Sequence, residues 1–271
     1  MDKTILYQTI NIGYKTFTPE GPATSPVILI HGFAEDGSIW DHQAAYLKNT
    51  HRLIIPDLPG SGRSSPLPGD TSMEALAGAV KAVLEAEKVK DGIMIGHSMG
   101  GYVTLAFAGL FPGMLKAFGL FHSTAYADSE EKKAARRKGM DFIRKNGAAA
   151  FIKQSTPNLF SETSRNQHPE WVTTLTDRYA GFHPDSLIRY YEAMIQRPDR
   201  THVLQQFTGP VLFIMGEQDG AVPLITSLQQ SHMPAMSYIH ILENSGHMGM
   251  MEETSRANLF LEEFLNDQYY A

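Results

Sequence analysis

The sequence predicts an α/β fold, in which a mostly parallel central sheet is flanked by helices and a helical segment is inserted between two strands. Two observations predict this fold. Short apolar runs alternate with helical patterns along much of the chain, and such alternation is typical of a parallel sheet. Between about residues 122 and 209 the helical patterns continue, but no convincing strand pattern separates them.

The predicted strands are continuous runs of apolar and β-branched residues. In a parallel sheet covered by helices, both faces of a strand are buried, so polar and apolar residues do not alternate along it. The six runs lie at residues 27–30, 52–58, 92–96, 117–121, 210–216 and 238–242.

Two helices between these strands have recognisable ends. Thr71 and Glu74 fit a capping box ahead of a run of good helix formers. A second, strongly apolar helix is predicted over residues 101–111, and Pro112 ends it because proline cannot donate the next backbone hydrogen bond.

The long segment without strands contains helical patterns at residues 130–145, 148–154, 170–179 and 186–196, separated by Pro, Gly and Asn. We therefore expect a core formed by residues 1–121 and 210–271. Residues 122–209 form a helical cap on this core.

A basic cluster lies near the start of the cap, and acidic residues precede it. This order suits the electrostatics of a helix, and it predicts a solvent-exposed helix face. The cluster consists of Lys132, Lys133, Arg136, Arg137 and Lys138.

Composition removes several classes of function. The formal charge of −6 provides no basic excess to attract nucleic acid or an anionic membrane, so neither is an expected partner. There is no cysteine, hence no disulfide or thiolate nucleophile. The first residues lack the apolar core of a signal peptide, and no apolar run reaches the roughly 18 residues of a membrane span. We expect a cytoplasmic protein, and nothing in the sequence predicts its oligomeric state.

Residues 92–101, GIMIGHSMGG, place a serine between a buried strand and an apolar helix. A sharp turn from strand to helix strains the residue at its tip and crowds the backbone on either side, so small residues are needed around it. Gly96 and Gly100 meet this need. The turn would lift the Ser98 hydroxyl above the sheet, at the start of a helix where negative charge is favoured.

With this turn the chain resembles the α/β-hydrolase family, and the resemblance covers nearly the whole length. Five segments match the landmarks of that family in order: HGF at 31–33, DLPGSGRS at 57–64, GHSMGG at 96–101, GEQDGAVP at 216–223 and SGHMGMME at 245–252. The family orders its catalytic triad as serine, acid and histidine, which Ser98, Asp219 and His247 satisfy. Glu217 is a rival for the acid.

The resemblance also implies an oxyanion hole formed by two backbone N–H groups. Met99 directly follows the serine, and Phe33 occupies the third position of the HGF segment. We expect the side chains of both, together with Trp40, His122 and Met248, to line the substrate pocket.

The other histidines and glycines predict no cofactor and no metal. We expect His31 to stabilise its own loop and His97 to point away from the cleft, and no histidine pair has metal-ligand spacing with a third ligand beside it. Residues 60–65 partly imitate a dinucleotide-binding fingerprint. However, Ser65 occupies the third glycine position, and no helix pattern begins there.

These patterns predict a serine hydrolase with a helical cap, which cleaves an ester or related acyl bond of a small, largely apolar molecule. Because no motif ties a basic cluster to the cleft, neutral substrates should be preferred over strongly anionic ones. A small-molecule sensor with slow or single turnover remains an alternative, as does a C–C bond hydrolase, a thioesterase or a perhydrolase that uses the same triad.

Overall fold

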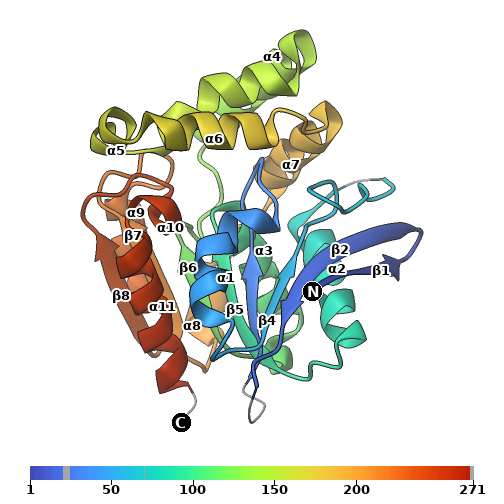
Figure 1. Ribbon diagram of the computed structural model, residues 1–271, viewed down its shortest axis with the longest axis vertical. Helices are drawn as coiled ribbons and strands as arrows, with labels where there is room; N and C mark the ends of the chain where they lie inside the picture. The colour runs from blue at the N-terminus through green and yellow to red at the C-terminus, as the bar shows by residue number, and fades with distance from the viewer. Residues whose placement is uncertain (21–24, 70, 269–271) are drawn as a thin grey trace.

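The computed structural model describes residues 1–20, 25–69 and 71–268, and its strands form one eight-stranded sheet (Figure 1). The order across the sheet is β1-β2-β4-β3-β5-β6-β7-β8. The strands are β1 (Asp2–Tyr7), β2 (Ile10–Phe17), β3 (Val27–Ile30), β4 (Leu53–Pro56), β5 (Gly92–His97), β6 (Leu115–Phe121), β7 (Val211–Gly216) and β8 (Ser237–Leu242).

All six predicted strands are present, and neighbours from β4 to β8 run parallel to each other. The sequence patterns did not predict β1 and β2, which pair antiparallel with each other and join the sheet at β4. In β1, more and less exposed residues alternate, as expected for an edge strand with one solvated face.

Helices cover both faces of the sheet. One face packs against α1 (Asp41–Leu47) and α11 (Thr254–Asp267), and the other against α2 (Met73–Ala86) and α3 (Met99–Leu110). Val27 and Leu29 pack on the face covered by α1 and α11, whereas Ile28 and Ile30 pack on the face covered by α2 and α3. Successive residues of β3 thus enter opposite cores, and burying each such side chain stabilises the fold by about 1.5–3 kcal/mol.

Two helix starts differ from the prediction. Ser72, not Thr71, caps α2, because its side chain accepts a hydrogen bond from the Ala75 N–H at 3.1 Å. The apolar helix α3 begins at Met99, immediately after the serine, two residues before the predicted start.

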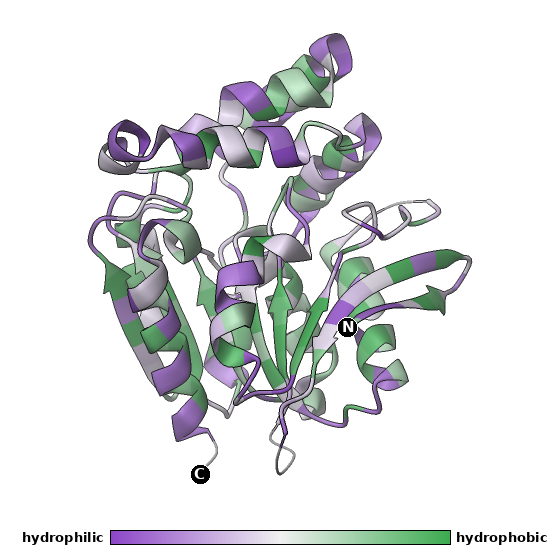
Figure 2. Cartoon of the chain, in the orientation of Figure 1, coloured by the Kyte–Doolittle hydropathy of each residue, from purple (hydrophilic) through white to green (hydrophobic). Residues whose placement is uncertain are grey.

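The described chain between β6 and β7 is helical, and its first helices lie above the carboxyl ends of the strands (Figure 1). The helices are α4 (Glu130–Ser155), the 3-10 turn η3 (Thr156–Leu159), α5 (Glu162–Gln167), α6 (Pro169–Tyr179), α7 (Pro184–Gln196) and α8 (Thr201–Gln206). Figure 2 shows mixed hydrophilic and hydrophobic residues on α4 and α6, above the hydrophobic strands.

Gly147 divides α4 with a φ of 83°, so the two predicted patterns form two helical pieces on either side of a kink. The short helices α5 and α8 were not predicted, and α8 packs against α3 on the core. The limits of the proposed cap, residues 122–209, stay a prediction.

The remaining helices follow strands near the carboxyl end of the chain. These are α9 (Leu224–Ser231), which packs against β7, and α10 (Gly249–Glu252), which precedes α11. None of the described helices combines the length and the apolar character needed to cross a membrane.

Candidate active site

Ser98 occupies the tight turn between β5 and α3. Its φ of 51° and ψ of −116° are strained for a residue with a side chain. A Cβ at position 96 would collide with the backbone of Gly100, and one at position 100 with the carbonyl oxygen of Ile30. The glycines are therefore required by the close approach of three backbone segments.

The structure brings Ser98, His247 and Asp219 together from three loops. The His247 Nε2 lies 2.8 Å from the Ser98 Oγ, and the His247 Nδ1 lies 2.8 Å from the Asp219 Oδ2. Asp219 follows β7 and His247 follows β8, so the parallel sheet delivers all three residues to one edge.

The Asp219 carboxylate is held by several donors. Its Oδ1 accepts hydrogen bonds from the backbone N–H groups of Ala221 and Val222, both at 2.8 Å. Burial alone would raise the pKa of Asp219, but His247 and His122 outweigh burial and hold this pKa well below its usual value. Glu217 is exposed and does not contact His247.

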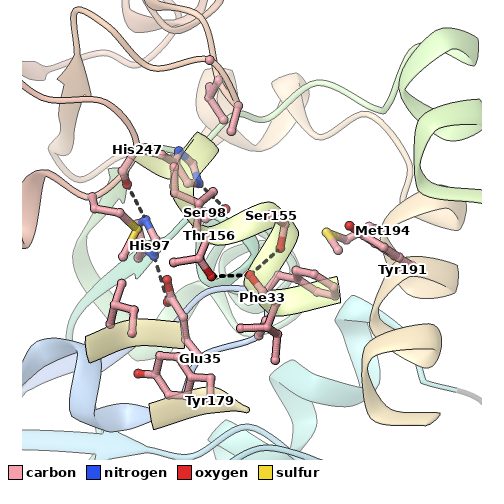
Figure 3. Close-up of a pocket in the computed structure, with 18 of the residues that line it drawn as sticks. Phe33, Glu35, His97, Ser98, Ser155, Thr156, Tyr179, Tyr191, Met194 and His247 are labelled. Atoms are coloured by element: carbon pink, nitrogen blue, oxygen red, sulfur yellow. Dashed lines mark hydrogen bonds and ion pairs between the residues drawn. The ribbon is translucent and has the colours of Figure 1, made fainter. Parts of the chain in front are cut away.

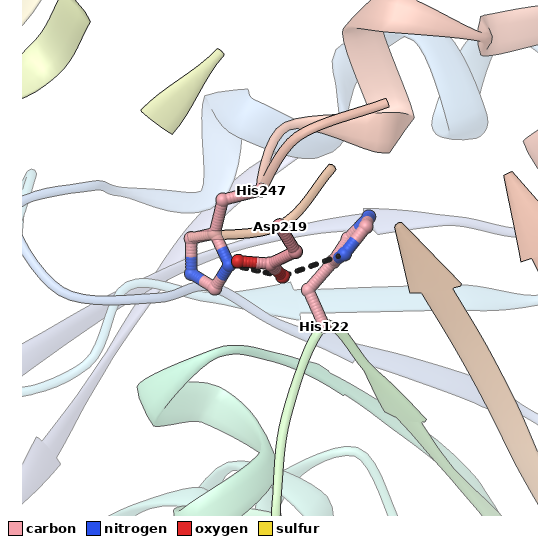
Figure 4. Close-up of side chains that lie close together, drawn as sticks. All are labelled: His122, Asp219 and His247. Atoms are coloured by element: carbon pink, nitrogen blue, oxygen red, sulfur yellow. Dashed lines mark hydrogen bonds and ion pairs between the residues drawn. The ribbon is translucent and has the colours of Figure 1, made fainter. Parts of the chain in front are cut away.

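His122 lies behind Asp219 and does not line the cavity above Ser98, contrary to the prediction (Figure 4). Its Nε2 accepts a hydrogen bond from the Gly249 N–H at 3.3 Å. The proton is therefore on Nδ1, which donates to the Asp219 Oδ2 at 3.1 Å. Burial lowers the pKa of His122 to about 4, so the ring is neutral at pH 7.

His122, Asp219 and His247 form a possible metal-ligand set that the sequence analysis did not find. One ligand atom from each lies within 4.8 Å of the others. The residues are far apart in the sequence, so no spacing motif signals them. Two ring nitrogens already donate hydrogen bonds to one carboxylate oxygen, which accounts for the close approach without an ion.

His97 forms a buried ion pair with Glu35 next to His247 (Figure 3). Its Nδ1 lies 3.0 Å from the Glu35 Oε2, and its Nε2 lies 3.0 Å from the backbone oxygen of His247. Both nitrogens face acceptors, so both carry protons. Burial disfavours the charged ring, but Glu35 outweighs burial and raises the pKa of His97. His97 was expected to point away from the cleft, yet it borders the cavity.

Glu35 also accepts a hydrogen bond from the Gly32 N–H at 2.6 Å, which fixes the loop after β3. In the part of the chain that the structure describes, the backbone N–H groups of Phe33 and Met99 form no hydrogen bond. Both therefore remain available as donors beside Ser98.

A cavity of about 250 Å³ lies over Ser98. Phe33 and Met248 line it. Trp40 and Met99 do not: Trp40 is fully buried between His97 and Phe121, and Met99 packs into the core. The helical insertion supplies apolar walls through Phe151, Ile152, Leu175, Tyr191 and Met194.

Two of the five residues in the basic cluster line this cavity, although the cluster was expected to form a solvent-exposed helix face. Lys132 donates a hydrogen bond from its Nζ to the Ala221 backbone oxygen at 2.9 Å. Arg136 pairs through its Nε with the Asp128 Oδ2 at 2.6 Å. The preference for neutral substrates was expected because no motif ties a basic cluster to the cleft, yet two residues of that cluster face the cavity.

Comparisons with known proteins agree with this architecture. A family profile described as alpha/beta hydrolase fold matches residues 25–254. A solved thermophilic esterase from Thermogutta terrifontis is 27% identical, with a TM-score of 0.92 and 99% of both chains covered.

Two curated relatives carry different activities. The "2-hydroxy-6-oxononadienedioate/2-hydroxy-6-oxononatrienedioate hydrolase" of Paraburkholderia phymatum is 24% identical over 260 residues, covering 92% of this chain and 90% of its own length. The "dihydrolipoyllysine-residue acetyltransferase component of acetoin cleaving system" of Pseudomonas putida is 27% identical over 255 residues, or 90% of this chain. This chain spans 64% of the length of that relative.

Proposed function

The chain belongs to the alpha/beta hydrolase family, and from this premise we propose that the enzyme is a serine hydrolase that cleaves an ester or related acyl bond of a small molecule. The observation that carries the proposal is the continuous hydrogen-bonded chain from Ser98 through His247 to Asp219, with 2.8 Å at both links. A serine hydroxyl needs such a base to become a nucleophile, and the base needs an orienting carboxylate.

The reaction begins when the Ser98 Oγ attacks the substrate carbonyl carbon while the His247 Nε2 takes its proton. Negative charge then develops on the carbonyl oxygen. The free N–H groups of Phe33 and Met99 stabilise this charge, and the start of α3 adds its favourable potential.

The tetrahedral intermediate collapses when His247 donates its proton to the leaving oxygen, which breaks the bond to the alcohol. The acyl group stays on Ser98. Water then attacks the acyl-enzyme with His247 again acting as base, and the acid product leaves.

Asp219 keeps the proton of neutral His247 on Nδ1 and stabilises the charged ring that forms during the reaction. The His122 N–H and two backbone N–H groups support this carboxylate from the other sides. The substrate lies in the cavity beneath the helical insertion, and most of its walls are apolar.

The test is covalent labelling by a fluorophosphonate probe together with hydrolysis of 4-nitrophenyl esters. Ser98→Ala should abolish labelling and reduce kcat/KM by roughly 10⁴- to 10⁶-fold. Ser129→Ala is the control, because this serine only caps α4 and should leave labelling intact. Labelling that persists in Ser98→Ala would show that another residue is the nucleophile.

A C–C bond hydrolase is the second candidate, favoured by the relative from Paraburkholderia phymatum that covers 92% of this chain. The same serine and histidine would serve in that reaction. Comparing ester hydrolysis with cleavage of a carbon–carbon bond in a vinylogous diketone separates the two candidates. A sensor would differ from both by releasing no more than about one product per chain.

A further inference from the structure

Lys132 and Arg136 present two positive charges to the cavity that contains Ser98. They are four residues apart on α4, so they lie one turn apart on the same side of the helix. Lys133 and Arg137 are their sequence neighbours but do not line the cavity, and Lys133 pairs with Glu130 at 2.8 Å.

The charge of Lys132 is not neutralised within the described chain. Its ammonium group donates to a neutral carbonyl, and no described carboxylate forms an ion pair with it. A half-buried ammonium group with one neutral acceptor retains donor capacity for a ligand.

Arg136 is only partly neutralised. Asp128 binds its Nε and Nη2, and the same carboxylate also pairs with Arg197 at 2.9 Å. One negative charge thus serves two arginines. The Arg136 Nη1 has no partner among the described residues, although the side chain lines the cavity.

Tyr102 adds a neutral donor beside these charges. It lies in the first turn of α3, just after Ser98, and both residues line the cavity. No described residue forms a hydrogen bond with its hydroxyl. Burial raises the pKa of Tyr102, but Arg197, Arg136 and Lys132 outweigh burial and lower this pKa overall. The local potential is therefore positive.

We propose that Lys132, Arg136 and Tyr102 form an anion-binding subsite, and that the natural substrate carries a carboxylate which this subsite holds while Ser98 attacks the ester group. The inference rests on the proposed function and narrows its substrate class. A carboxylate can accept charge-assisted hydrogen bonds from an ammonium and a guanidinium group at once. The apolar walls accommodate the carbon chain between the two ends.

Paired substrates of equal length test this subsite. The 4-nitrophenyl hemiester of glutaric acid carries a terminal carboxylate, and 4-nitrophenyl valerate ends in a methyl group at the same distance. The wild type should favour the hemiester in kcat/KM by about 10-fold or more, the value of one charge-assisted hydrogen bond. A preference for valerate would exclude an acyl part whose carboxylate binds in the subsite.

Variants of α4 test whether Lys132 causes the preference for the hemiester. Lys132→Gln keeps a donor for the Ala221 oxygen but removes the charge, and it should reduce the ratio of hemiester to valerate activity by about 10-fold. Lys132→Arg should restore most of the ratio. Lys133→Gln removes the same charge from the same helical turn outside the cavity and should leave the ratio unchanged. Equal ratios in Lys132→Gln and Lys133→Gln would contradict binding of the acyl part in the subsite.

The carboxylate can belong to the acyl part or to the alcohol part of the ester. A second pair, 4-acetoxybenzoate and 4-methylphenyl acetate, places the same difference on the alcohol side. A Lys132-dependent preference in either pair supports the subsite and identifies the part that binds there. If neither pair shows a Lys132-dependent preference, the proposal is overturned.

A binding measurement separates this proposal from the proposed reaction. Ser98→Ala should bind glutarate in titration calorimetry, and the additional change Lys132→Gln should weaken the Kd by about 10-fold. If no ester is hydrolysed but this binding is found, the reaction is wrong and the subsite stands. If esters are hydrolysed but Ser98→Ala does not bind glutarate, the subsite is wrong and the reaction stands.

Discussion

Asp219 is an acceptor whose hydrogen bonds come from two rings and two backbone groups. Asp219→Asn would replace one oxygen by an amide nitrogen, which cannot accept the His247 N–H. The ring would then take the wrong tautomer, and kcat/KM for 4-nitrophenyl esters should fall by about 10⁴-fold. Glu217→Gln is the matched control and should be nearly silent. The opposite result would make Glu217 the acid.

His122 makes the free energy of unfolding depend on pH. Its pKa is 6.5 when unperturbed and about 4 in the folded protein, where burial disfavours the charged ring. Between these values the unfolded chain binds more protons, so stability is lost as the pH falls through this range. From pH 7 to pH 5 the loss from this group should be about 2 kcal/mol.

Urea denaturation of the wild type and of His122→Gln at both pH values measures this loss. The variant should show a pH dependence that is weaker by about the same 2 kcal/mol. Parallel pH dependences in the two proteins would show that His122 is not held neutral by the fold.

Motifs predicted Ser98, Asp219 and His247 because each follows a strand at the same sheet edge. They could not predict side-chain direction within a turn. His122 has a φ of 51°, which residue types do not signal, and its ring lies behind Asp219. Trp40 was expected in the pocket, but its ring lies in the core.

In α4, the spacing of residues along the helix predicts which basic residues face the cavity, whereas the number of basic residues in the cluster does not. Lys132 and Arg136 continue the spacing of Met140 and Ile143, which are buried, so all four fall on one side of the helix. That periodicity could have found the basic residues of the cavity. The short helices α5 and α8 contain six residues each, too few for a clear period.

The kink of α4 depends on Gly147. Its φ of 83° and ψ of 167° define a conformation that is essentially restricted to glycine, and a Cβ there would meet no atom within 4 Å. Gly147→Ala therefore tests backbone strain without a steric clash, and it should lower the free energy of unfolding by about 1–3 kcal/mol. Gly113→Ala is the control, since it also has open space but no positive φ. Equal effects in urea denaturation would rule out strain as the cause.

Across the whole molecule, the cavity lies where the sheet edge meets the helical insertion. Phe33 from the loop after β3 stacks on Tyr191 of α7 with ring centroids 4.3 Å apart, so one wall is shared by both parts. The mostly parallel sheet followed from continuous apolar runs in the sequence. The antiparallel strands β1 and β2 were not predicted, because polar and apolar residues alternate along them and form no continuous apolar run.

The Asp128 carboxylate links the two ends of the segment that contains α4 and α7, and this link affects how the two helices open. Asp128 lies where the chain enters the insertion, and Arg197 lies where α7 ends, so their ion pair fastens the two ends of the intervening segment to each other. The Arg200 N–H adds a hydrogen bond to the Ala125 oxygen at 2.8 Å. This neck predicts that α4 and α7 open together as one cooperative unit rather than fraying separately.

Amide hydrogen exchange measures this opening. Asp128→Asn should speed exchange in α4 and α7 by similar factors and leave β5 and β6 slow, because the core strands do not depend on the neck. Asp141→Asn removes an exposed ion pair with Arg144 from the same helix and should change neither helix. Faster exchange in α4 alone would mean that the two helices open independently. If they open together, one buried ion pair controls how often the walls that α4 and α7 contribute to the cavity separate from the core.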